Sequence, residues 1–139
     1  MFSALVGETM ATLFRILIGI LGVLGLLAAC LFWLDPERAG AGVGLDLANA
    51  TGAATIRAQI AGFFAASGLF ALVAAVRNRP QPALGALVLV LFALFGRIVN
   101  LAANGWHALF LPPIAIECVT IAIIAFAWHF MRQRPKTIS

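Results

Sequence analysis

The chain has 139 residues, of which 63% are hydrophobic and 10% are charged, and its formal net charge is +4. Soluble domains are about 25% charged, so this chain has too few polar side chains to cover the surface of a water-soluble monomer of its length. The composition therefore excludes an ordinary soluble fold. It predicts one domain, residues 1–139, embedded in a lipid bilayer.

Two long apolar segments lie in the first half of the chain, and each reaches the roughly 20 residues that a helix needs to cross a bilayer. The first, about residues 12–34, ends at the sequence DPER, because proline and charged residues stop a hydrophobic helix. A Gly/Ala-rich segment, residues 39–54, reads as a loop with room for one short helix. The second span follows at about residues 55–76.

Two further spans occupy the second half. A basic, proline-containing turn at residues 77–82 precedes the third span, about residues 83–103. Gly105 is suited to a helix end, and Pro113 to the first turn of the fourth span, about residues 113–131. Consecutive spans alternate in direction across a membrane. The predicted fold is therefore all-α, a four-transmembrane-helix bundle with antiparallel up-and-down topology.

Small residues three or four positions apart share a helix face and let two helix backbones approach closely. Residues with this spacing are Gly19, Gly22 and Gly25 in the first span, and Ala54, Ala58, Gly62 and Ala66 in the second. We predict that these residues lie at contacts between helices.

The distribution of Lys and Arg near span ends predicts the orientation in the membrane. One side holds the amino terminus, the 77–82 turn and the tail, with Arg15, Arg77, Arg79, Arg132, Arg134 and Lys136. The opposite loops hold Arg38 and the borderline Arg57, together with Asp35, Glu37 and Asp46. We therefore expect both termini in the cytoplasm. The basic residues form no continuous stripe, so nucleic acid is not an expected partner.

The amino-terminal span also allows a second reading. Leu27-Ala28-Ala29-Cys30 resembles the lipobox of a bacterial lipoprotein signal peptide, and cleavage there would remove the first span. The apolar run continues through residues 31–34, and the region before it is long and contains Glu8, which favours an uncleaved span. The mass of the intact protein distinguishes the two readings.

Ionisable groups inside the hydrocarbon are informative because each raises the free energy of membrane insertion by about 2.5 to 3.5 kcal/mol at the middle of the bilayer. Arg97 lies about 10 Å inside the end of the third span, and Glu117 about 6 Å inside the start of the fourth. Asn100 and Asn104 share the helix face of Arg97, and Arg57 begins the second span at the same level. The sequence thus predicts a polar cluster of these five residues in the outer half of the bundle.

Two readings of this cluster stay open. In one, Glu117 pairs with an arginine and the cluster holds the bundle together. In the other, two arginines face one carboxylate, and the unmatched guanidinium binds an anion such as a lipid phosphate. As an alternative to a bound anion, Asp46 or Glu37 from the loop pairs with the unmatched guanidinium. Side chains on helices lean toward the amino terminus of their own helix, which places the Arg97 side chain deeper in the membrane and the Glu117 side chain further outward. This difference in depth favours Arg57 over Arg97 as the partner of Glu117.

Other reactive side chains form no recognisable site. Cys30 and Cys118 lack metal-ligand spacing and lie in apolar stretches, which favours free, buried thiols. His107 and His129 lie near opposite ends of the fourth region, too far apart to hold one metal. We predict no metal, no cofactor and no catalytic residue, since the sequence has no phosphate loop, nucleophile elbow or HExxH motif.

Several short motifs resemble a family of small four-helix bacterial membrane proteins, domain of unknown function 4345. They are Arg57, Gly62-Phe63-Phe64, Gly68-Leu69, Gly96-Arg97, Asn104-Gly105 and Glu117, and the similarity runs from about residue 11 to residue 132. In that family an aspartate is usual where this chain has Asn104, and a serine is usual near Asn100. The resemblance implies a membrane location and a four-helix bundle, and we expect this membrane to be a bacterial inner membrane. It implies no activity.

The sequence favours a non-enzymatic membrane protein, a structural or accessory module whose cluster fixes the fold or binds a lipid head group or a small anion. A homo-oligomer or a partner membrane protein fits this hypothesis. The alternative is a small membrane enzyme or a quinone-associated redox subunit, which rests on analogy between folds. The third hypothesis is a component of an oligomeric transporter, because four short helices rarely enclose a pathway alone.

Overall fold

A computed structural model of the chain describes residues 2–43, 45, 50–106 and 108–133. Within these residues all regular secondary structure is helical. Four helical segments are long and apolar enough to cross a membrane: Gly7–Leu34, Ala50–Arg77, Pro80–Asn104 and Leu111–Arg132. Each contains one of the spans expected from the sequence. Asp46, His107, Arg134 and Lys136, which entered the predictions above, lie outside the described residues.

The first long helix, α1 (Phe2–Leu34), ends at the DPER sequence. Asp35 then caps a short helix, α2 (Pro36–Gly42), because its Oδ1 accepts a hydrogen bond from the backbone N–H of Arg38 at 3.1 Å. Pro36 occupies the first turn, where its missing N–H has no consequence for the helix. The same four residues therefore stop one helix and start the next.

The second long segment consists of α3 (Ala50–Thr55), a π-helical turn (Ile56–Ile60) and α4 (Ala61–Arg77). It begins five residues before the expected span. α4 ends at Asn78, whose φ of 50° is the left-handed conformation that commonly terminates helices.

The third and fourth long helices follow in the second half of the chain. α5 (Pro80–Asn104) ends at Gly105, which has a φ of 76°. A 3-10 turn (Ala108–Phe110) leads into α6 (Leu111–Arg132).

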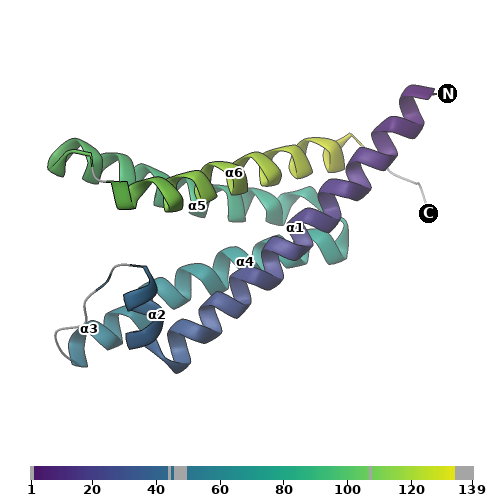
Figure 1. The fold of residues 1–139 in the computed structure, drawn as a ribbon. Helices are drawn as coiled ribbons and strands as arrows, with labels where there is room; N and C mark the ends of the chain where they lie inside the picture. The colour runs from purple at the N-terminus through teal and green to yellow at the C-terminus, as the bar shows by residue number, and fades with distance from the viewer. Residues whose placement is uncertain (1, 44, 46–49, 107, 134–139) are drawn as a thin grey trace.

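The four long helices associate as two pairs. α1 lies along α4, and α5 lies along α6, while α4 also contacts α5 and α1 also contacts α6 (Figure 1). The pairs come together at the end that holds the amino terminus of α1. They diverge toward the other end, which carries α2 and α3 and which we call the α2–α3 end.

Glycines bring the backbones of α1 and α4 into contact. A Cβ added to Gly68 of α4 would lie 2.8 Å from the carbonyl oxygen of Gly22 in α1. A Cβ on Gly22 would lie 2.7 Å from the backbone nitrogen of Leu72, and one on Gly25 would lie 3.0 Å from the Cα of Gly68. Such close approach gives two helices extensive van der Waals contact, which is the main force available between them in lipid.

The contact does not follow the small-residue stripe expected in the second span. Ala58 is exposed, and a Cβ on Gly62 would meet nothing within 4 Å, so the prediction is wrong for both residues. Ala66 is only half-buried. α4 carries small residues on several faces, so spacing alone does not select the face that touches α1. The tight contact is made by Gly68 instead.

The larger cluster of buried hydrophobic residues lies in the half of the molecule that holds the amino terminus of α1. Its buried residues are Ile18, Ala71, Ala74, Ala75, Ala83, Ala86, Val90, Ile124, Ala127 and Met131. Phe14 of α1 stacks on Phe126 and Phe130 of α6, with ring centroids 5.4 Å apart in each case. A second, smaller cluster of Phe32, Ile56 and Ala61 lies at the α2–α3 end. These contacts join the pairs in one half and leave them apart in the other.

Candidate functional site

An ion pair joins α5 to α6 in the half where the helix pairs diverge. The Nε of Arg97 lies 2.6 Å from Oε1 of Glu117. The Glu117 side chain is 14% exposed and that of Arg97 is 41% exposed, so the carboxylate is enclosed and the guanidinium is open on one side. The structure thus brings together the two charged residues that the sequence places at similar depth.

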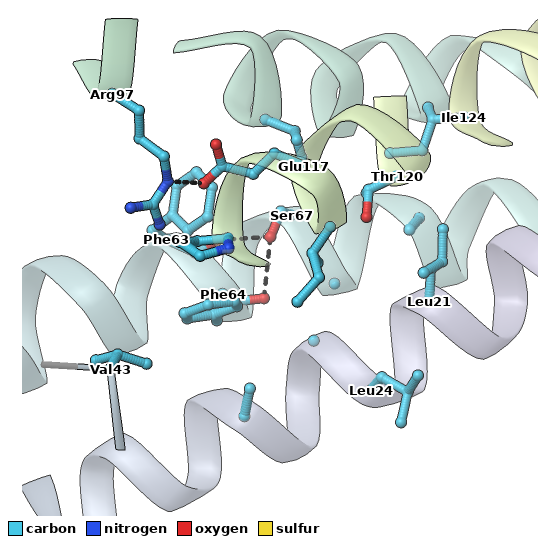
Figure 2. A pocket seen from close by; sticks show the side chains of 17 residues that line it. Leu21, Leu24, Val43, Phe63, Phe64, Ser67, Arg97, Glu117, Thr120 and Ile124 are labelled. Atoms are coloured by element: carbon cyan, nitrogen blue, oxygen red, sulfur yellow. Dashed lines mark hydrogen bonds and ion pairs between the residues drawn. The ribbon is translucent and has the colours of Figure 1, made fainter. Parts of the chain in front are cut away.

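This ion pair leaves polar atoms of both residues without partners. Oε2 of Glu117 is buried and accepts no hydrogen bond from any described residue. The terminal nitrogens of Arg97 donate to no group within the described part of the chain, and they point away from the bound carboxylate oxygen (Figure 2). A guanidinium has five N–H donors, of which a single one is used here. Four donors therefore stay available to another molecule.

A pocket of about 350 Å³ lies between the two helix pairs beside Arg97 (Figure 2). Its walls come from α1, α4, α5 and α6, and most of the lining side chains are apolar, including Leu21, Leu24, Phe63, Phe64, Val90 and Ile124. Binding sites for small molecules commonly measure about 300–1,000 Å³ and combine apolar walls with a few polar groups. The pocket has both properties.

Two hydroxyl groups add to the polar side of this pocket. The Ser67 hydroxyl donates to the carbonyl oxygen of Phe63 at 2.8 Å, which leaves its lone pairs free to accept. The Thr120 hydroxyl forms no hydrogen bond with any residue that the structure describes, and it points into the pocket (Figure 2). Our sequence reasoning missed both residues. Thr120 follows Glu117 by one helical turn, and this spacing was the available signal.

Arg57 lies away from the ion pair. Its Nε donates to the carbonyl oxygen of Trp33 at 3.0 Å, and the indole Nε1 of Trp33 donates to the carbonyl oxygen of Arg57 at 3.1 Å. The expectation that Arg57 is the better partner of Glu117 is therefore wrong. The physical reason is that carbonyls in the last turn of a helix lack intrahelical donors, and the carbonyl of Trp33, at the end of α1, attracts the guanidinium of Arg57.

The two asparagines of the predicted cluster bond to each other. Nδ2 of Asn104 donates to Oδ1 of Asn100 at 2.7 Å, and both residues are exposed. Asn100 also lines a second cavity of about 330 Å³ on the α5–α6 side, together with Arg97 and Glu117. The structure thus places Asn100 next to the ion pair, with Asn104 one turn further along α5.

The two cysteines are free, and both are exposed. The expectation that they are buried is wrong, because helices that are apolar on every face do not reveal in their sequence which face packs inward. Among the described residues no group of three or more His, Cys, Asp or Glu side chains is arranged to hold a metal ion.

Comparison with known proteins gives one match. The family model described as "Domain of unknown function (DUF4345)" matches residues 13–129, which include both members of the ion pair and all of the residues that line the pocket. No curated protein and no solved structure matches the chain. This chain has four helices long and apolar enough to cross a membrane. Since the family model covers most of its sequence, the chain belongs to the DUF4345 family, a domain of unknown function.

Proposed function

We propose that this protein is a multi-pass protein of a bacterial inner membrane that binds a lipid-like molecule in the pocket between its helix pairs. In this proposal the four long helices cross the membrane in alternating directions as an antiparallel bundle. The apolar part of the ligand lies against the aliphatic and aromatic wall, and its polar part lies at Arg97.

The observation that carries this proposal is the group of unused donors on Arg97 at the edge of an apolar pocket. Water is scarce at this depth of a bilayer, and polar groups there need partners from the protein or from a bound molecule. A free inorganic anion would satisfy the guanidinium but would leave the apolar wall unfilled. A lipid-like molecule matches both parts of the pocket.

The ion pair has a structural role in the same proposal. It ties α5 to α6 in the half of the molecule where the two helix pairs diverge, and it holds the guanidinium in position for a ligand. The protein is thus a structural or accessory module with a lipid site, in which one pair of charges serves both purposes.

The proposed orientation places both termini in the cytoplasm. Arg77 ends α4, Arg79 precedes α5 and Arg132 ends α6, and these helix ends lie at the end of the bundle that holds the amino terminus of α1. Asp35 and Glu37 lie at the start of α2, at the α2–α3 end. Basic residues concentrate on the cytoplasmic side of membrane proteins, which supports this orientation. The α2–α3 end then faces the periplasm.

Native mass spectrometry of the full chain from gentle detergent tests the lipid site. We expect a bound lipid-like molecule on the wild-type protein and its loss from Ala28→Phe, because Ala28 lines the pocket and the larger side chain fills it. The matched control is Leu27→Phe, since Leu27 is the neighbouring residue and is 55% exposed on the outer surface of α1. Equal occupancy of the two variants would show that the adduct is ordinary surface lipid, and a wild-type protein without any adduct would overturn the proposal.

A further inference from the structure

The polar groups around the pocket indicate the chemical class of the ligand. Arg97 presents hydrogen-bond donors, and the hydroxyl of Thr120 is free to donate as well. Oε2 of Glu117, the remaining acceptor of the ion pair, is fully enclosed and is not accessible to a ligand. The accessible part of the site therefore favours a ligand that accepts hydrogen bonds.

The charge of the pocket is already balanced. Arg97 and Glu117 are the ionisable residues among those that line it, and they form a contact of 2.6 Å with each other. An anionic ligand would bring one uncompensated negative charge into a region of low dielectric, where unpaired charges are costly. A neutral acceptor gains hydrogen bonds from the guanidinium and adds no charge. The second arginine that would have favoured an anion, Arg57, is bonded to Trp33.

The free hydroxyl adds a second contact. Thr120 lies one helical turn from Glu117 on the same face of α6, so it is about 5 Å further along the pocket. Its hydroxyl points toward the space between the pairs (Figure 2). A ligand with two oxygen atoms near its polar end, such as an ester, is able to engage Arg97 and Thr120 together.

We propose that the pocket binds a neutral, lipid-soluble molecule whose carbonyl oxygen accepts hydrogen bonds from the terminal nitrogens of Arg97, with Thr120 as a second donor. This inference rests on the proposed lipid site and specifies its ligand class. It replaces the anion expected from the sequence with an uncharged carbonyl compound.

Three probes of equal chain length test the ligand class on the full chain in detergent. They are methyl palmitate, which has a neutral carbonyl, palmitate, which is an anion, and hexadecane, which has no acceptor. We expect methyl palmitate to bind roughly tenfold more tightly than either of the others, because one hydrogen bond to a charged donor gives about that factor. Titration followed by native mass spectrometry gives the three affinities.

A variant of the second donor tests the geometry. Thr120→Val keeps the shape of the side chain and removes its hydroxyl, so we expect methyl palmitate to bind about fivefold more weakly while hexadecane binding is unchanged. Thr51→Val is the control, since Thr51 is exposed on α3 and does not line the pocket. An unchanged affinity of Thr120→Val for methyl palmitate overturns the role of Thr120.

The outcomes separate the two proposals. Palmitate binding as tightly as methyl palmitate would show an anion site, and equal binding of hexadecane would show a pocket without polar recognition. Either result overturns the carbonyl ligand and leaves the lipid site intact. Failure of all three probes, together with the absence of any copurifying lipid-like molecule, overturns the lipid site itself.

Discussion

Trp33 and Arg57 each donate a hydrogen bond to the backbone carbonyl of the other residue, at 3.1 Å from the indole and 3.0 Å from the guanidinium. Trp33 lies in the last turn of α1, and Arg57 lies in the π-helical turn before α4. In that turn the backbone N–H of Ala61 bonds to the carbonyl of Ile56, five residues earlier. These two hydrogen bonds therefore hold α1 and the π-helical turn before α4 together at the α2–α3 end.

Trp33→Phe is expected to weaken the contact between Trp33 and Arg57. The substitution keeps an aromatic ring and removes the indole N–H, which leaves the carbonyl of Arg57 without that donor and costs about 1 kcal/mol of unfolding free energy. Thermal unfolding in detergent measures the change. Trp106→Phe is the control, because Trp106 is 61% exposed beyond the end of α5 and its substitution should leave stability unchanged. Equal effects of the two variants would contradict a specific role for the Trp33–Arg57 contact.

Gly68→Ala is expected to disrupt the α1–α4 contact. The added Cβ would lie 2.8 Å from a backbone oxygen and 2.9 Å from a backbone nitrogen of α1, so the helices must separate. We expect a loss of about 1–3 kcal/mol, as for other overpacked sites. Unfolding in detergent of increasing SDS content measures it.

Gly62→Ala is the matched control in the same helix. A Cβ at Gly62 meets nothing within 4 Å, and alanine is favoured over glycine in helices by up to about 1 kcal/mol. This variant should be as stable as the wild type or slightly more stable. If Gly62→Ala proved the more damaging of the two, the contact face assigned to α4 would be incorrect.

The Arg97–Glu117 pair should behave as a coupled unit. Glu117→Gln leaves a guanidinium without its counter-charge, and Arg97→Met leaves an enclosed carboxylate without its partner. We expect each single variant to lose about 2 kcal/mol of stability, and the double variant to lose clearly less than the sum. A double-mutant cycle on unfolding in detergent gives the coupling energy.

The exposed asparagine pair provides the comparison for this cycle. Asn100→Ala and Asn104→Ala remove a hydrogen bond at the exposed surface of α5, so their coupling should stay below about 0.5 kcal/mol. Additive effects of the Arg97 and Glu117 variants would mean that the ion pair contributes nothing to the association of α5 with α6.

Cysteine labelling tests the proposed orientation. In a background of Cys30→Ala and Cys118→Ala, we expect Ala41→Cys on α2 to react with a membrane-impermeant maleimide in spheroplasts. Gln81→Cys, at the start of α5, should react only after the membrane is opened. Both positions are exposed in the structure, so access through the membrane decides the result. The reverse pattern would place the termini outside the cytoplasm.

The sequence alone was sufficient for the helices that are long enough to span a membrane and for finding Arg97 and Glu117 as charged residues inside the third and fourth of them. Apolar length and the positions of Pro and Gly are local properties, so the ends of the spans are readable to within five residues. The sequence placed Arg97 and Glu117 at similar depth on consecutive spans, but it favoured Arg57 as the partner of Glu117. The cost of isolated charges in hydrocarbon makes such residues conspicuous in any apolar sequence.

Tertiary structure decided which face of each helix packs inward, which arginine holds Glu117, and where a pocket opens. Helices that are apolar on all sides carry no amphipathic signal, and this is why the contact at Gly68 and the pocket hydroxyls of Ser67 and Thr120 were not predicted. The partner of Arg57 depended on a backbone carbonyl at the end of α1, which becomes available only when that helix ends beside the π-helical turn. Contacts of this kind follow from the relative placement of helices, which local sequence properties do not encode.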